Sequence, residues 1–286
     1  MDIGRLFSTS FAMFRQRFWP LAGMWAVFFA IQIGAMIVLG IAAAVLGISG
    51  LATDLEDPAA IAGMGVGMIL LLVLFYGAYI VVILAQQAAL VTLASPLEEP
   101  AFGAALSRGF RSALPFLGIT LIMVLVYFVL VLVLGGVAGL AAAGGGAAGS
   151  ILVALLAVPA IIYLGCRFAV LVPVVAVDQV FNPLTAIRRS WAVTQGKVLA
   201  IFLAIVGFLL ASLVALGLPF GLMVYLLGGT GGGSADPGAA FGMVALGFLV
   251  FVPLFIAYSI YAAAFTASMH SEVTGGGAES LEEVFA

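Results

Sequence analysis

The chain has few of the residues on which catalytic and metal sites usually depend. It contains a single cysteine, Cys166, and a single histidine, His270, among 286 residues. One cysteine excludes an intramolecular disulfide and any multi-cysteine metal site, and one histidine excludes a cluster of imidazole ligands. Hydrolysis by a serine, histidine and aspartate would have to use His270, which lies at the end of the last apolar run before a glycine-rich tail. The sequence therefore predicts no enzyme, no cofactor and no metal.

Charged residues are also scarce, at 7% of the chain, whereas 65% of the residues are hydrophobic. Soluble domains contain about 25% charged residues, so this composition is typical of a polytopic membrane protein. The long apolar runs contain no aspartate or glutamate, which argues against a di-metal site or a proton relay within the membrane. The net charge of −3 gives no reason to expect a nucleic-acid partner.

Six apolar runs are each long enough to cross a bilayer as a helix. Pro173 is expected to kink or end the fourth of these spans, and Pro219 and Pro253 to kink the fifth and sixth. The spans predicted in this way are residues 20–47, 61–94, 114–140, 151–172, 198–227 and 239–267.

Three further segments have apolar side chains at helical spacing on one side and arginines off that side. The third of them begins with Asn182-Pro183, a helix N-cap followed by a residue suited to the first turn, and ends at Gly196. Each segment precedes a pair of apolar runs, so we expect three interfacial helices on the membrane surface. They lie in residues 1–18, 96–113 and 178–197.

One surface helix followed by one hairpin thus occurs three times, and the three units align. Matching Phe11, Phe110 and Trp191 places Gln86 on Arg167. The sequence predicts an all-α polytopic domain with six transmembrane helices in three hairpins and a possible pseudo-threefold repeat. A chance alignment of apolar sequences remains the alternative. The predicted domain is 1–268, its possible repeats are 1–95, 96–177 and 178–268, and 269–286 would be an acidic, flexible cytoplasmic tail.

The basic residues define the expected topology. In a six-span arrangement all nine basic residues fall on one face. The charged residues of the opposite loops are all acidic. The positive-inside rule then places both termini and the three surface helices in the cytoplasm. We call these nine residues the basic collar, which would attract anionic lipid headgroups. The collar consists of Arg5, Arg15, Arg17, Arg108, Arg111, Arg167, Arg188, Arg189 and Lys197.

Arg167 differs from the rest of the collar because apolar residues flank it on both sides. Its stem can reach back to the interface, or its guanidinium can pair with Asp178 and join the fourth span to the third surface helix. Alternatively, Arg167 forms an anion or lipid-headgroup site together with Arg188, Arg189 and Lys197. Gln86 and Gln87 are expected to form hydrogen bonds between helices.

The stretch around Arg167 also resembles a known family. The residues involved are Arg167-Phe168, Pro173, Asp178, Asn182-Pro183, Ala186-Ile187, Ser190-Trp191 and Thr194-Gln195-Gly196. Their order is similar to the recurring pattern of bacterial proteins named for the membrane domain of glycerophosphoryl diester phosphodiesterase. The resemblance implies a stand-alone module of the bacterial cytoplasmic (inner) membrane. In fused relatives the phosphodiesterase chemistry belongs to a separate soluble barrel, with histidines and metal-binding carboxylates that are not found in this sequence.

Two functions fit these observations. The first is a non-catalytic inner-membrane module whose basic collar organises lipids or a partner membrane protein. The second is a carrier or permease-like protein for a lipid or a small anionic solute, suggested by Arg167, the possible repeat and the kinked spans. A cavity that reaches Arg167 would favour the carrier, whereas a filled bundle would favour the module.

Overall fold

The computed structural model describes residues 1–45, 66–229 and 237–275, and these residues form helices and short connections without strands. Six helical segments within these ranges are long and apolar enough to cross a membrane. The predicted all-helical, multi-pass class is therefore confirmed. The acidic loop around residues 50–60, the loop containing Asp236 and most of the predicted tail lie outside the described residues.

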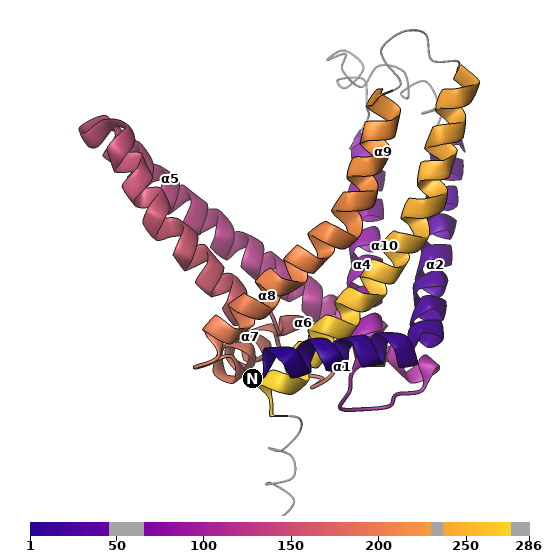
Figure 1. Ribbon diagram of the computed structural model, residues 1–286, viewed down its shortest axis with the longest axis horizontal. Helices are drawn as coiled ribbons and strands as arrows, with labels where there is room; N and C mark the ends of the chain where they lie inside the picture. Colours follow the sequence, from indigo (N-terminus) through magenta and orange to yellow (C-terminus); the bar gives the residue numbers. More distant parts are fainter. Residues whose placement is uncertain (46–65, 230–236, 276–286) are drawn as a thin grey trace, which may run out of the picture.

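The first two spans are α2 (Phe18–Val45) and α4 (Val66–Ala94). They follow α1 (Ile3–Gln16), a separate helix that lies across one end of the molecule (Figure 1). We call this end the base. The Asp2 side chain caps α1 by accepting a hydrogen bond from the Arg5 N–H at 3.2 Å. The first predicted surface segment is thus a helix distinct from the span that follows it.

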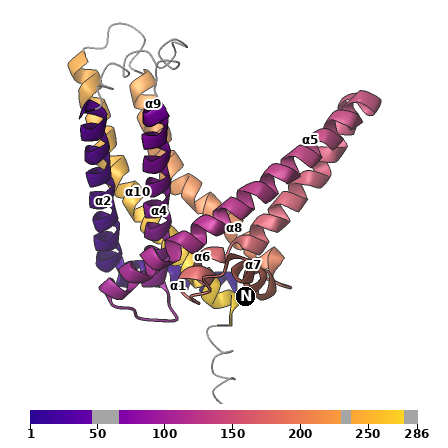
Figure 2. The same ribbon diagram turned by 180° about the vertical axis from the view of Figure 1, so that it is seen from behind.

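The third and fourth spans form one element, α5 (Phe102–Phe168), which folds back on itself at Gly146. Gly146 has φ 59° and ψ −148°, a conformation that residues with side chains rarely adopt. The first arm (residues 102–145) leads away from the base and the second arm (residues 147–168) returns to it (Figure 2). The two arms approach closely near the turn, where a Cβ on Gly149 would lie 2.3 Å from the Ala141 carbonyl oxygen.

The start of α5 corrects one prediction. We expected residues 96–113 to contain a separate surface helix, but from Phe102 onward they are the first part of α5, which continues through Pro115 without a break. The third surface segment stops because Gly196 adopts a φ of 73°. The second segment has no residue with a positive φ before its span, so nothing ends the helix there.

Two short helices follow at the base, α6 (Leu171–Ala176) and α7 (Pro183–Val193). Helix α5 ends at Phe168, and the fourth apolar span continues through α6 to Ala176. Pro173 lies in the first turn of α6, where its missing N–H breaks no helical bond. The Asn182 side chain accepts hydrogen bonds from the Leu184 and Thr185 N–H groups at 3.0 and 3.3 Å. The predicted cap of this helix is therefore confirmed.

The fifth span consists of α8 (Val198–Ser212), the π-helical turn η2 (Leu213–Gly217) and α9 (Leu218–Gly229). The missing N–H of Pro219 removes a helical bond to the preceding turn, and the span changes direction at η2 (Figure 1). The sixth span is α10 (Pro237–Val273), which contains Pro253 and extends five residues beyond the predicted domain end at 268.

The spans diverge from the base in two directions. Helices α2, α4, α9 and α10 run upward together, whereas the α5 hairpin leans away from them, so that the molecule has the outline of a V (Figures 1 and 2). Two clusters of buried apolar residues lie where the elements converge, one including Leu6, Val174 and Ile201 and the other including Leu21 and Phe28. Large apolar side chains farther along the spans are exposed, as expected for surfaces that face lipid.

Each predicted surface segment packs against the base end of another span. Helix α1 packs on α10, the start of α5 packs on α4, and α7 packs on α5. Small residues at aligned positions permit these contacts: Ser10 and Ser190 are fully buried, and a Cβ on Gly109 would lie 2.6 Å from the Ala85 carbonyl oxygen. A threefold repeat would produce this arrangement, although the repeat itself stays a prediction.

Candidate functional site

Arg167 lies at the base end of the second arm of α5 and is only 7% exposed. Its Nε and Nη2 groups donate to the Tyr163 hydroxyl at 3.0 and 2.8 Å, and Nη1 donates to the Trp191 carbonyl at 2.9 Å. A longer bond of 3.5 Å joins Nη1 to the Thr194 hydroxyl. These four bonds use four of the five N–H donors of the guanidinium, so little of it is available to another ligand.

Aromatic rings complete the surroundings of this charge. The guanidinium carbon lies 5.2 Å from the centre of the Tyr163 ring and 4.6 Å from that of Trp191, distances at which a cation is attracted to the ring face. The Ser190 hydroxyl donates to the Arg167 carbonyl at 2.8 Å. Each of the helices α5 and α7 therefore donates a hydrogen bond to the other. We call Tyr163, Arg167, Ser190, Trp191 and Thr194 the arginine junction.

The structure contradicts the predicted pair between Arg167 and Asp178, since the described part of the chain contains no such ion pair. Asp178 instead pairs with Arg189, with 3.1 Å between Oδ2 and Nε, and lies close to His270, with 3.3 Å between Oδ1 and Nε2. Long side chains on a helix point toward its N-terminus. Arg167 therefore extends back over Tyr163 and away from the linker that contains Asp178.

Asp178 joins two elements at the base, because Arg189 belongs to α7 and His270 to α10. Burial by itself raises the pKa of the Asp178 carboxyl, but His270 and Arg189 together outweigh burial and hold that pKa below its ordinary value. The His270 side chain is 1% exposed, and neither ring nitrogen has the geometry of a hydrogen bond.

The other residues of the predicted anion site do not converge on Arg167. Arg188 is exposed, Arg189 is paired with Asp178, and the Lys197 ammonium donates to the Val273 carbonyl at the end of α10. A cation in that position also interacts favourably with the helix dipole. Sequence reasoning combined four basic residues that the fold uses separately.

Much of the basic collar is used within the molecule. Arg5 pairs with Glu272 and Arg108 with Glu98, while Arg17 pairs with Glu99 and donates to the Leu93 carbonyl at 2.9 Å. These contacts tie the ends of the spans together. Within the described ranges, the collar residues that are exposed and form no ion pair are Arg15, Arg111 and Arg188.

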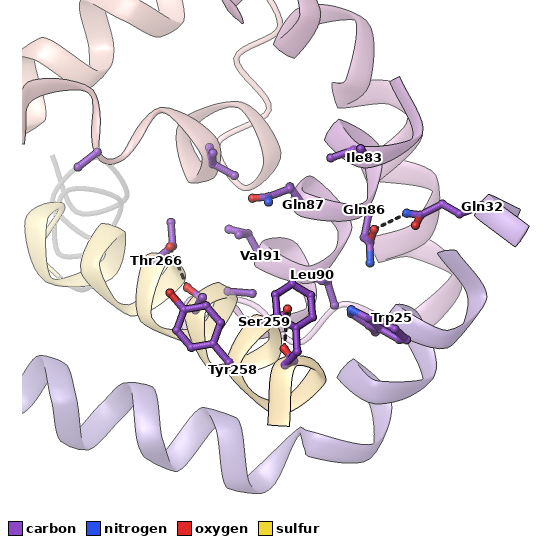
Figure 3. A pocket seen from close by; sticks show the side chains of 15 residues that line it. Trp25, Gln32, Ile83, Gln86, Gln87, Leu90, Val91, Tyr258, Ser259 and Thr266 are labelled. Carbon is purple, nitrogen blue, oxygen red and sulfur yellow. Dashed lines mark hydrogen bonds between the residues drawn. The ribbon is translucent and has the colours of Figure 1, made fainter. Parts of the chain in front are cut away.

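Gln86 and Gln87 line a cavity of about 550 Å³ that we call the polar pocket. Its walls come from α2, α4, α10 and the region around α6 (Figure 3). The Gln32 side chain on α2 donates to the Gln86 carbonyl oxygen on α4 at 2.8 Å. None of the described residues that line this pocket carries a charge.

A second cavity of about 610 Å³, which we call the groove, lies between α4 and the α5 hairpin. Its lining is almost entirely apolar and includes Leu84 of α4, with Phe116 and Val124 of the first arm. Val172 of α6 lines both the groove and the polar pocket, so the two cavities lie on neighbouring sides of this residue. Arg167 lines neither of them.

Sequence reasoning missed three partners in this region. Tyr163 lies one helical turn before Arg167, so the spacing of i and i+4 could have indicated it. Gln32 is a polar residue within an apolar run and could have been noticed as a hydrogen-bonding candidate. His270 is far from Asp178 along the chain, and no local pattern connects them.

Residues 147–277 match the family model described as the membrane domain of glycerophosphoryl diester phosphodiesterase. This part of the chain is therefore similar to that family. The matched residues of this chain contain the second arm of α5, the arginine junction, and the elements from α6 to α10. The resemblance seen in the sequence is thus confirmed, and the residues that suggested it are largely those that dock α7 on α5. No curated protein and no solved structure matches the chain.

Proposed function

We propose that this chain is a non-catalytic module of the bacterial inner membrane that holds lipid in the groove. The observation that supports this function is the divergence of the α5 hairpin from the other spans, which leaves an apolar cavity of about 610 Å³ at the vertex of the V. Water has few hydrogen-bond partners on such a surface. In a bilayer the acyl chains of a lipid are the chemically matched occupant.

The basic collar supports the same function. Arg15, Arg111 and Arg188 are exposed at the base, where they would attract the anionic headgroups of a cytoplasmic leaflet. The remaining collar residues maintain the arrangement of helix ends that creates the groove. In this proposal both chain termini face the cytoplasm.

A lipid carrier is the second candidate, and η2 is the observation that favours it. A π-helical turn within a span often marks a bend with a functional role. A small anionic solute is less well supported, because Arg167 already uses most of its donors within the protein. Exchange of labelled lipid between the leaflets of vesicles containing the purified protein would support the carrier, and lipid retention without exchange would support the module.

Filling the groove tests the proposed function. Val124 lines the groove and is 60% exposed, so Val124→Trp should displace the bound lipid. We expect the lipid retained by the purified protein, measured by native mass spectrometry, to fall about tenfold, which corresponds to ~1.4 kcal/mol of lost binding.

Leu125→Trp provides the matched control. Leu125 is the next residue along α5 and is 63% exposed, but it does not line the groove. This variant should retain as much lipid as the wild type. Equal retention by the two tryptophan variants would contradict the proposal, and a co-purified protein in place of lipid would favour the partner-organising alternative.

A further inference from the structure

We infer that the polar pocket binds an uncharged, hydroxyl-bearing headgroup, such as a polyol or glycosyl group, of a lipid whose acyl chains occupy the groove. This inference rests on the proposed lipid-holding function and specifies the class of lipid. It concerns residues that neither the arginine junction nor the basic collar uses.

The chemistry of the lining determines the type of headgroup. Polar groups enter the pocket from three walls. Gln32 lies on α2, Gln86 and Gln87 lie on α4, and Tyr258, Ser259 and Thr266 lie on α10 (Figure 3). No Asp, Glu, Lys, Arg or His occurs among the described residues of the lining. A phosphate or ammonium group would therefore be desolvated without a counter-ion, which costs far more than burying a neutral group.

The hydrogen-bonding groups that remain available match hydroxyl groups. Gln86 uses its carbonyl oxygen for the bond from Gln32, which leaves its two amide N–H donors. Ser259 and Thr266 donate to carbonyls of their own helix, so their oxygens remain as acceptors. Within the described residues the exposed Gln87 side chain forms no hydrogen bond, and an amide side chain without a partner is costly in the hydrocarbon region. Hydroxyl groups both donate and accept, and can satisfy all of these side chains.

The position of the pocket favours a lipid over a free solute. Gln86 is eight residues before the end of α4 at Ala94, or about 12 Å along the helix axis. The headgroup layer extends about 5–8 Å beyond each side of the hydrocarbon core. With Ala94 at the outer edge of this layer, Gln86 lies about 4–7 Å within the hydrocarbon core, next to the headgroups. Because Val172 lines both cavities, they lie next to each other, and one lipid can place its headgroup in the polar pocket and an acyl chain in the groove.

The experiment offers the full-length protein a choice of lipids. The purified protein is reconstituted into vesicles of equimolar phosphatidylglycerol, phosphatidylethanolamine and monoglucosyl diacylglycerol. It is then extracted with a detergent that has no sugar headgroup. Native mass spectrometry measures the lipid retained. We expect the monoglucosyl lipid to be enriched over the two charged lipids, and Gln87→Leu to lower its retention about three- to tenfold, as expected for the loss of one hydrogen bond.

The control is Gln195→Leu, which removes an exposed glutamine at the base outside the pocket and should leave retention unchanged. Equal retention of the three lipids, or an equal loss of all three in Gln87→Leu, would overturn the inference. Free methyl glucoside at millimolar concentration should not displace the lipid; if it does, the pocket takes a soluble sugar and the lipid assignment is wrong. Val124→Trp should release all lipids alike, so retention that depends on Val124 without preference among headgroups would leave the proposed function intact and reject this inference alone.

Discussion

Tyr163 accepts two hydrogen bonds from the Arg167 guanidinium, so its hydroxyl stabilises a charge that is almost completely buried. Tyr163→Phe keeps the ring and removes only this acceptor. We expect the free energy of unfolding to fall by about 1–3 kcal/mol, the range for hydrogen bonds to a charged group and for a buried donor left unpaired. Thermal unfolding of the purified protein in one detergent measures the change.

Tyr76→Phe is the matched control, because Tyr76 is 58% exposed on α4 and forms no hydrogen bond within the described part of the chain. Its loss of a hydroxyl should leave the melting temperature unchanged. Equal melting temperatures for the two variants would show that the arginine junction does not stabilise the fold.

Part of this junction could be predicted from the sequence. Arg167 is recognisable because a charge between apolar neighbours requires a compensating interaction. The predicted partner of Arg167 was wrong, because the partner depends on the direction of the side chain and not on proximity in sequence. Arg167 extends toward Tyr163, whereas Asp178 lies beside His270 of α10. Such directions are set by the packing of α7 on α5, which composition does not encode.

Among the elements, α7 and α10 are joined through Asp178, and that joint should depend on pH. The pKa of the Asp178 carboxyl is lowered in the folded protein, so its stabilising effect is complete above the ordinary carboxyl pKa of about 3.9. It is lost as the pH falls through the lower, folded value. We expect wild-type stability to decline below about pH 4 and the decline to be smaller in Asp178→Asn, as measured by thermal unfolding between pH 7 and 3.

Glu99→Gln provides a comparison for this effect. Glu99 pairs with Arg17, but its side chain is 92% exposed, and exposed pairs contribute little to stability. This variant should follow the wild-type pH profile. An Asp178→Asn profile that coincides with the wild type would mean that the carboxylate does not hold α7 and α10 together.

Most elements could be predicted from periodicity and from local signals. The six spans have long apolar runs, and α7 has a cap at Asn182 and a stop at Gly196 that act over a few residues. The prediction of a separate surface helix at the start of α5 was wrong. Surface and spanning segments are both helical, so only an interruption of the helix distinguishes them. Pro115 does not do so, since one missing hydrogen bond is tolerated where the remaining bonds of the helix persist.

At the scale of the molecule, the first and last helices meet at the base, where Arg5 of α1 pairs with Glu272 of α10. We expect reporter fusions to place both termini and the linker at 178–182 in the cytoplasm, because all nine basic residues belong to this end. A reporter inserted within residues 230–236 should give the opposite signal. A periplasmic signal from the 178–182 linker would refute the topology and the cytoplasmic collar with it.

The V-shaped outline could not be predicted. Hydropathy identifies which segments enter the bilayer, but lipid tails and apolar side chains are chemically alike, so it does not say which spans pack together. Leu21 and Val124 belong to similar apolar sequences, yet one is fully buried and the other faces the groove. The difference arises from the contacts at the base, which are made by few residues.

The length of the first arm of α5 has a consequence for how the protein fits its bilayer. Residues 114–145 rise about 48 Å along the helix axis at 1.5 Å per residue, whereas the hydrocarbon core is about 30 Å thick. Standing upright, the arm would suffer hydrophobic mismatch, which helices relieve by tilting. The excess length, much of it supplied by the glycine and alanine residues before Gly146, is accommodated by the lean that separates the hairpin from α4. A shortened tip would let the hairpin stand straighter and narrow the space beside it.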